Sequence, residues 1–300
     1  MSFHKQPPTP WVETDEVDLY LDAVEASEEQ RRFVLDLHRD GVAVIDLGPE
    51  GHILCDRVIV ETESYFGAGA RRAQDTWRRS TAVRALSTLP LVESMLALAY
   101  GRRPFAFQTL NFQYGSEQHA HADAVHFHSE PPRFMCGVWF ALEDVEIDAG
   151  PLFYHPGSHK RPVFGMRDAG VVGRAPAPGD YEALYVPAFA RQLESQPRVA
   201  LLKKGQALVW AANLAHGGVP ITRAGATRRS LVTHYYFENC LYYTPMYSAP
   251  EEGRYHLRLP ANVRTGGWVW PRHQGKRVKL RPQTVFLAIK DAVKRVVHVA

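Results

Sequence analysis

The chain has few cysteines and no pattern that would use them as a framework. Cys55, Cys136 and Cys240 are odd in number, far apart and outside any CxxC pair. Disulfide scaffolds and structural zinc sites both need cysteines that pair at suitable spacings. The sequence therefore argues against both, and it predicts a protein of the reducing cytoplasm.

Long apolar runs and a strong charge of one sign are also missing. The N-terminal sequence MSFHKQPP has no apolar segment of the kind that a secretory signal needs, and no uninterrupted run is long enough to cross a bilayer. The formal net charge of +3 is too small to imply nucleic acid binding. We therefore expect a small-molecule partner, with no stable membrane insertion. The basic segment 272–281 is consistent with a solvated loop or with a surface that attracts an anionic substrate or lipid.

The pattern of apolar residues predicts one domain at 17–300, which follows a flexible arm at 1–16. Ser27 and Gln30 form a capping box before a helix that ends at Asp40-Gly41. Further helices are expected near 53–65 and 91–100. From about 105 to 240, short aromatic and β-branched runs alternate with Gly and Pro, which predicts a sandwich or jelly roll. The expected strands are 42–47, 105–114, 121–127, 134–142, 152–154, 198–202, 207–210 and 228–237.

Two helical segments are expected outside this pattern. Residues 180–193 form a predicted insert between strands, after a Pro- and Gly-containing loop. Residues 284–297 form a predicted C-terminal helix, and its apolar stripe is expected to pack on the core. The predicted fold is therefore mainly β with flanking helices.

Three residues stand out as metal ligands. His121 and Asp123 are two residues apart, so an extended backbone would direct both side chains to one face. His216 follows a predicted strand and precedes Gly217-Gly218, which would allow a sharp turn. Two imidazoles and one carboxylate on one face form the triad of non-haem Fe(II) oxygenases.

An arginine downstream adds to this interpretation. Alternation along the predicted strand places Arg228, Ser230, Val232, His234 and Tyr236 on one face. If that face lines the interior, Arg228 is a buried cation that needs an anion, either a carboxylate of a ligand or a structural partner.

These residues resemble the phytanoyl-CoA dioxygenase-like branch of the iron/2-oxoglutarate oxygenases. The resemblance covers roughly residues 105–240. It rests on motifs that occur in the family order: His121-Ala122-Asp123, Trp139 in GVWFAL, Gly150-Pro151-Leu152, Pro156-Gly157-Ser158-His159, His216-Gly217-Gly218 and Thr227-Arg228 leading to His234-Tyr235.

The resemblance implies a double-stranded β-helix (a cupin-like jelly roll) that uses Fe(II), 2-oxoglutarate and dioxygen. His121, Asp123 and His216 match the iron ligands, and Arg228 matches the residue that binds the distal carboxylate of 2-oxoglutarate. Trp139, Gln118 and Ser230 are the other expected cosubstrate contacts. The implied reaction is hydroxylation of an unactivated C–H bond of a small-molecule or lipid-like substrate, with succinate and CO2 as co-products.

Two other functions remain open at this point. A cupin-type metalloenzyme would use His119, His121, Glu130 and His159 as ligands, although it would leave His216 and Arg228 without a role. A non-catalytic jelly-roll binding module would simply pack its histidines. The sequence also suggests a substrate pocket lined by a set of aromatic and histidine residues: His126, Phe127, His128, Phe134, Met135, Tyr236 and Tyr242.

Overall fold

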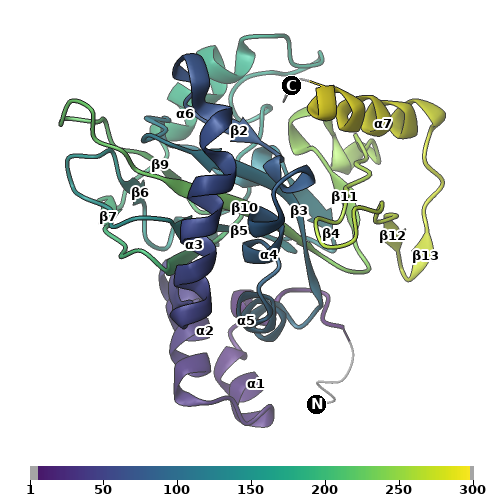
Figure 1. The fold of residues 1–300 in the computed structure, drawn as a ribbon. Coiled ribbons are helices and arrows are strands. Elements are labelled where there is room, and N and C mark those ends of the chain that lie inside the picture. The colour runs from purple at the N-terminus through teal and green to yellow at the C-terminus, as the bar shows by residue number, and fades with distance from the viewer. Residues whose placement is uncertain (1–5, 298–300) are drawn as a thin grey trace.

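A six-stranded antiparallel sheet forms the centre of the computed structural model, which describes residues 6–297 (Figure 1). The strand order is β1-β8-β5-β10-β3-β2, so strands that are distant in sequence become neighbours. The strands are β1 (Val42–Asp46), β8 (Gln206–Ala211), β5 (Met135–Ala141), β10 (Ser230–Phe237), β3 (Pro104–Phe112) and β2 (Arg72–Gln74).

Shorter strands make up the rest of the β structure. A three-stranded sheet has the order β7-β6-β9, and its members are β7 (Arg198–Ala200), β6 (Leu152–Tyr154) and β9 (His216–Gly218). A single bridge between His121 and His216 adds residue 121 to its edge. Two further pairs are β4 (His128–Glu130) with β11 (Leu241–Tyr243), and β12 (Arg272–His273) with β13 (Lys276–Arg277).

The helices gather mainly on one face of the large sheet, where α3, α4 and α5 lie in Figure 1. Their bounds are α1 (Val17–Ala23), α2 (Glu28–Asp40), α3 (Gly48–Thr62), α4 (Thr81–Leu86), α5 (Pro90–Tyr100), α6 (Val186–Ala190) and α7 (Pro282–Val297). The capping box that begins α2 is confirmed, since Ser27 Oγ accepts from Gln30 N and Gln30 Oε1 accepts from Ser27 N. Gly41 ends the helix in a left-handed conformation with φ of 79°.

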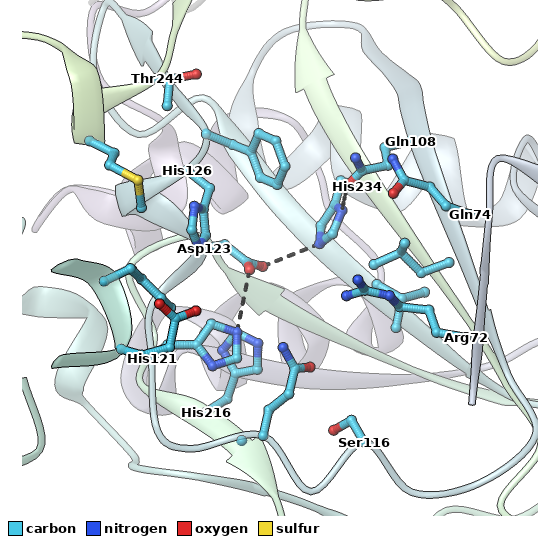
Figure 2. Close-up of a pocket in the computed structure, with 18 of the residues that line it drawn as sticks. Arg72, Gln74, Gln108, Ser116, His121, Asp123, His126, His216, His234 and Thr244 are labelled. Carbon is cyan, nitrogen blue, oxygen red and sulfur yellow. Dashed lines mark hydrogen bonds and ion pairs between the residues drawn. The ribbon is translucent and has the colours of Figure 1, made fainter. Parts of the chain in front are cut away.

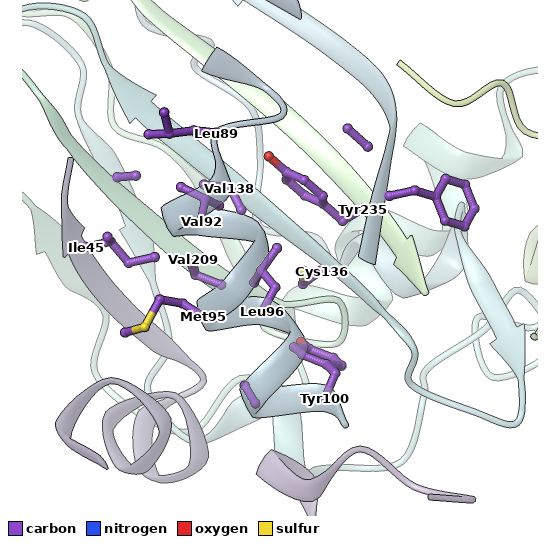
Figure 3. Close-up of a cluster of buried hydrophobic side chains, with 14 of the residues drawn as sticks. Ile45, Leu89, Val92, Met95, Leu96, Tyr100, Cys136, Val138, Val209 and Tyr235 are labelled. Atoms are coloured by element: carbon purple, nitrogen blue, oxygen red, sulfur yellow. The ribbon is translucent and has the colours of Figure 1, made fainter. Parts of the chain in front are cut away.

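Strand alternation divides the large sheet into a helix-covered face and an inner face. Tyr235, Cys136 and Val138 belong to the main core, where they lie close to residues of α5 such as Leu96 (Figure 3). Trp139 belongs instead to a second apolar cluster, which includes residues of the small sheet. The inner face is thus left for the polar residues of β10 and its neighbours.

Several sequence predictions need correction. In place of the expected strand at 121–127 there is a single bridge at His121 and then a 3-10 turn at Asp123–Val125. Arg228 precedes β10 and does not open it. The helical insert that was predicted at 180–193 is present, as a π-helical turn at Tyr181–Tyr185 that continues into α6. On α7, Phe286 and Ile289 are exposed, so the expected packing of that stripe on the core is wrong for these two residues.

Part of the predicted flexible arm is packed. Val12 is buried, and the Pro7 carbonyl accepts hydrogen bonds from the Arg102 guanidinium. The structure describes the arm only from residue 6 onward.

One segment has the length and mean hydropathy of a membrane-spanning helix. It is Thr81–Tyr100, and more than half of it is buried in the protein. The segment is divided between α4 and α5, and Ser87 in the connection contacts Thr233 and Tyr235 of β10. Core helices meet the same criterion, so this is weak evidence for a membrane role.

Buried histidines should make the fold sensitive to acid. Burial lowers the pKa of both His128 and His159 from 6.5 to about 4. The unfolded chain therefore takes up protons first, and stability that is complete above pH 6.5 is lost as the pH falls toward 4. Between pH 7.5 and pH 5 we expect each residue to contribute about 2 kcal/mol to the loss.

Urea unfolding of the wild type and of His159→Gln at the two pH values tests this. Glutamine keeps a donor for the His38 carbonyl, which His159 Nε2 contacts in the wild type. The variant should show a flatter pH dependence than the wild type, whereas His273→Gln, at an exposed position, should not. An unchanged pH dependence in His159→Gln would contradict the assignment.

Candidate metal centre

Three buried side chains converge at the edge of the small sheet. One ligand atom from each of His121, Asp123 and His216 lies within 4.8 Å of the others, and among the described residues no other group of His, Cys, Asp and Glu does so. His121 Nε2 is 3.9 Å from Asp123 Oδ1, and the two imidazole centroids are 4.5 Å apart. The structure thus brings together the three residues that the sequence predicted as metal ligands.

The backbone holds the three residues in this arrangement. His121 and His216 exchange two N–H···O=C hydrogen bonds of 2.9 Å each. Ala122 is extended, with φ of −117° and ψ of 136°, which directs the side chains of residues 121 and 123 toward the same side. The geometry that was expected from a strand is therefore produced by one bridge and one extended residue.

The two glycines after His216 serve close approach and not the sharp turn expected from sequence. They lie within β9, and neither has a positive φ. A Cβ on Gly217 would stand 2.6 Å from the Gln118 carbonyl oxygen, and one on Gly218 would stand 2.6 Å from Ser116 Oγ. Glycine at both positions lets the 116–118 segment cross directly over the strand.

Hydrogen bonds fix which nitrogen of each histidine faces the centre. His121 Nδ1 lies 2.8 Å from the His119 carbonyl, and His216 Nδ1 lies 3.0 Å from the Leu214 carbonyl. A carbonyl only accepts, so Nδ1 carries the hydrogen in each ring and the Nε2 lone pair is available to a metal ion.

The electrostatics of the site favour a metal-binding protonation state. Burial and the neighbouring His121 lower the pKa of His216 to about 4, which leaves the imidazole neutral at physiological pH. Burial alone would raise the pKa of Asp123, but His234, His216 and His121 outweigh it and hold this pKa far below its ordinary value. Two neutral imidazoles and one carboxylate are the donor set of a non-haem Fe(II) site.

One oxygen of Asp123 is occupied by two rings that the sequence reasoning did not assign to the site. Trp210 Nε1 donates to Asp123 Oδ2 at 2.8 Å, and His234 Nε2 lies 3.4 Å from the same atom. Figure 2 shows Asp123 between His234 and the His121–His216 pair. Oδ1 is therefore the oxygen left toward the histidines, which favours binding of a metal through a single carboxylate oxygen.

Gly137 makes room for this arrangement. It pairs with Trp210 in β8 on one side and with His234 in β10 on the other. A Cβ at position 137 would stand 2.2 Å from the Trp210 ring. Gln108 fixes the second ring, since its Oε1 lies 2.9 Å from His234 Nδ1.

The buried polar atoms that have no hydrogen-bond partner among the described residues include Trp139 Nε1, Arg228 Nε and Ser230 Oγ, which lie on or next to the neighbouring strands β5 and β10. The Arg228 guanidinium lies 5.1 Å from the Trp139 ring centroid. Burial lowers the pKa of Arg228 to about 10, so it remains a cation. Glu143 pairs with Arg229 and not with Arg228, and the described residues give Arg228 no ion pair. These atoms match the sequence-predicted cosubstrate contacts.

A second arginine of the cavity lies outside the sequence prediction. Arg72 is on edge strand β2, where it pairs with Phe112, and the Arg228 guanidinium lies 5.8 Å from the Phe112 ring. Arg72 also lines the cavity, as does the predicted contact Gln118. Nothing in the sequence around Arg72 indicated a strand that would join the sheet.

The residues of the cupin-type alternative do not come together. His119 is exposed, and His159 is buried elsewhere, where its Nε2 contacts the His38 carbonyl at 3.1 Å. Glu130 lies in β4 and is paired with β11. This ligand set is therefore wrong.

The cavity at the triad has a volume of about 660 Å³. Of the suggested lining residues, His126 and Phe127 do line it. His128 lines a neighbouring cavity of about 790 Å³. The other four, Phe134, Met135, Tyr236 and Tyr242, belong to the main core.

Comparison with known proteins agrees with this geometry. The sequence profile described as phytanoyl-CoA dioxygenase (PhyH) matches residues 68–230, more than half of the chain. The chain belongs to this family. A curated relative is the mouse phytanoyl-CoA dioxygenase domain-containing protein 1, which is 30% identical over 84 residues. That match covers 27% of this chain and 29% of the mouse protein, so it spans less than a third of the relative.

Solved structures share the fold of this PhyH-family chain. The epimerase SnoN, in complex with Fe3+, α-ketoglutarate and nogalamycin RO, is 19% identical with a TM-score of 0.57, and covers 80% of this chain and 97% of its own. EctD from S. alaskensis, with 2-oxoglutarate and 5-hydroxyectoine, is 16% identical with a TM-score of 0.51, and covers 70% and 76%. The antiparallel core with flanking helices is thus the double-stranded β-helix that the sequence predicted.

The contact between Trp210 and Asp123 predicts a loss of metal affinity in Trp210→Phe. Without the indole N–H, the carboxylate can rotate, and we expect about tenfold weaker binding because partners of metal ligands carry effects of this size. Calorimetric titration of the metal-free protein with Zn(II) measures it.

Gly137→Ala should also weaken Zn(II) binding, because the added methyl group would displace the Trp210 ring. Trp270→Phe is the matched control, since its indole donates to the Val278 carbonyl elsewhere. Wild-type affinity in both Trp210→Phe and Gly137→Ala would show that Asp123 is held without these groups.

Proposed function

We propose that this protein is an Fe(II)- and 2-oxoglutarate-dependent dioxygenase that hydroxylates a C–H bond of a small molecule. Family membership and the triad of His121, Asp123 and His216 support the iron. The observation that carries the cosubstrate is the set of unpartnered donors on Trp139, Arg228 and Ser230.

The unpartnered donors call for an anion. A buried donor without a partner costs about 1–3 kcal/mol, and more when it is charged. Three of them at the inner face of β5 and β10, with no described carboxylate paired to Arg228, leave a site that one ligand carboxylate would satisfy. A dicarboxylate can place one end here and direct the other toward the triad.

Each residue of the site has a defined task in this reaction. His121 and His216 would hold the iron through their Nε2 atoms and Asp123 through Oδ1, and these three protein ligands would leave room for cosubstrate and dioxygen. Arg228 and Trp139 hold and orient the distal carboxylate. When bound, iron and 2-oxoglutarate supply the oxidising chemistry, in which one oxygen atom of O2 enters the substrate as hydroxyl and the other enters succinate, with release of CO2.

The binding-module alternative lacks an explanation for this site. Packed histidines would satisfy their ring nitrogens inside the fold, yet both triad imidazoles direct Nε2 toward a buried carboxylate and a cavity. A module without cofactors would also gain nothing from an unpaired arginine that is 4% exposed.

Removal of a metal ligand or of the arginine should give separable defects. His121→Ala and Asp123→Ala are expected to abolish Fe(II) binding. Arg228→Gln should keep iron and weaken 2-oxoglutarate binding by about 100-fold, because it removes a charge-assisted hydrogen-bond pair. Anaerobic titration with Fe(II) and then 2-oxoglutarate, followed by the weak visible band of the chelate, measures both.

Arg229→Gln is the matched control, since Arg229 is the adjacent residue and pairs with Glu143 away from the cavity. It should bind both iron and 2-oxoglutarate like the wild type. If Arg228→Gln retained full 2-oxoglutarate affinity, the carboxylate would bind elsewhere. If folded wild-type protein bound neither iron nor 2-oxoglutarate, the proposed reaction would be ruled out.

A further inference from the structure

The cavity has a further cation that is not among the expected cosubstrate contacts. Arg258 follows β11 in sequence and lines the cavity together with Thr244 and His126. Figure 2 places Thr244 at the opposite end of this space from Ser116 and Arg72. The cavity therefore has a second arginine-bearing region, on the far side of the metal centre.

The Arg258 guanidinium is braced in a fixed orientation. Its Nη1 donates to Thr244 Oγ1 at 3.1 Å, and its Cζ lies 4.7 Å from the centroid of the Phe127 ring. The backbone N–H of Arg258 donates to the Tyr242 carbonyl at 2.8 Å, which ties the segment to β11. A planar guanidinium that stacks on a ring loses little freedom when it binds a carboxylate or a phosphate.

The surroundings of Arg258 are aromatic and sulfur-containing. Tyr181, Tyr247, Met166 and Met246 line the same cavity. His256 lies beside the arginine, and burial together with the charge of Arg258 lowers its pKa, which favours a neutral imidazole. This region offers one fixed cation within a wall that suits an apolar or aromatic body.

The charges of the cavity leave room for one more anion. Among its described lining residues other than histidine, the ionised groups are three arginines, Arg72, Arg228 and Arg258, and two carboxylates, Asp123 and Glu182. With a divalent metal and the doubly charged 2-oxoglutarate bound, the net charge would be +1. A negatively charged substrate would offset this excess of positive charge, which lowers the electrostatic cost of the site.

We propose that the substrate is an organic anion whose carboxylate or phosphate oxygens bind Arg258, with its carbon body directed toward His126 and the metal centre. This inference rests on the proposed function and assigns the substrate class of the same site. Arg258 is then the specificity-determining residue, and Thr244 and Phe127 orient it.

Direct binding of simple probes tests the proposal without turnover. The protein is loaded with Zn(II) and saturated with 2-oxoglutarate, so that the cosubstrate contacts are occupied. Benzoate, phenyl phosphate and neutral benzamide are then titrated by saturation-transfer NMR. The first two probes distinguish a carboxylate from a phosphate, and benzamide controls for the ring alone.

We expect saturable binding of at least one anion and no saturation by benzamide. Arg258→Gln should weaken binding of the anion at least tenfold, and the affinity of Arg258→Lys for the anion should lie between those of Arg258→Gln and the wild type. Arg103→Gln removes the same charge from an exposed site, with 75% of its side chain accessible, and should have no effect. Thr244→Val keeps the charge of Arg258 but removes the hydrogen bond that orients it, and it should weaken binding of the anion about threefold. This variant provides the test if Arg258→Gln does not fold.

The outcomes separate this inference from the proposed function. Equal affinity of wild type and Arg258→Gln for the anion overturns the inference, as does equal binding of benzoate and benzamide, or no saturation by either anion. Loss of 2-oxoglutarate binding in folded Arg258→Gln also overturns it, because Arg258 would then serve the cosubstrate. Failure of the wild type to bind 2-oxoglutarate in the presence of Zn(II) would instead contradict the proposed function.

Discussion

The burial of the Asp123 carboxylate is the constraint on which the rest of the site depends. An isolated carboxylate in a protein interior is strongly unfavourable, so it must be surrounded by donors and positive charge. Trp210 and His234 supply contacts to one oxygen, and the other faces His121. The surroundings of this single group therefore determine which oxygen remains for a metal and from which direction it can bind.

Meeting that constraint requires residues from distant parts of the chain. Trp210 comes from β8 and His234 from β10, and both reach the carboxylate because Gly137 of β5, the strand between them, has no side chain. The strand order of the large sheet is thus part of the chemistry of the site. A side chain at position 137 would act on the metal centre although it contacts no ligand directly.

Helices on one face of the sheet free the other face for polar groups. Because α5 and its neighbours bury Tyr235, Val138 and Cys136, the alternate residues of the same strands point inward. Ser230 at the start of β10 and Arg228 just before it continue this inner face, and each has a polar atom without a hydrogen-bond partner among the described residues. The cavity then extends across the triad to Arg258, so that one cavity holds both the proposed cosubstrate contacts and the proposed substrate contact.

The sequence by itself predicted the triad, a cosubstrate role for Arg228 and the general fold. These follow from local information: residue type, a spacing of two residues, alternation along strands and motifs in family order. The structure brings the three triad residues together, and a bridge and one extended residue take the place of the strand that was expected at His121–Phe127.

Only the tertiary structure decided which residues surround that triad. Trp210, Arg72 and Arg258 resemble ordinary core or surface residues in the sequence, because a tryptophan donor or an arginine carries no local mark of its partner. Alternation placed His234 on the inner face, but it did not indicate the contact with Asp123. Likewise, Phe134 and Tyr242 lie in the core although their types suit a pocket. Strand order and register determine these contacts, and both arise from packing between segments that are far apart in the chain.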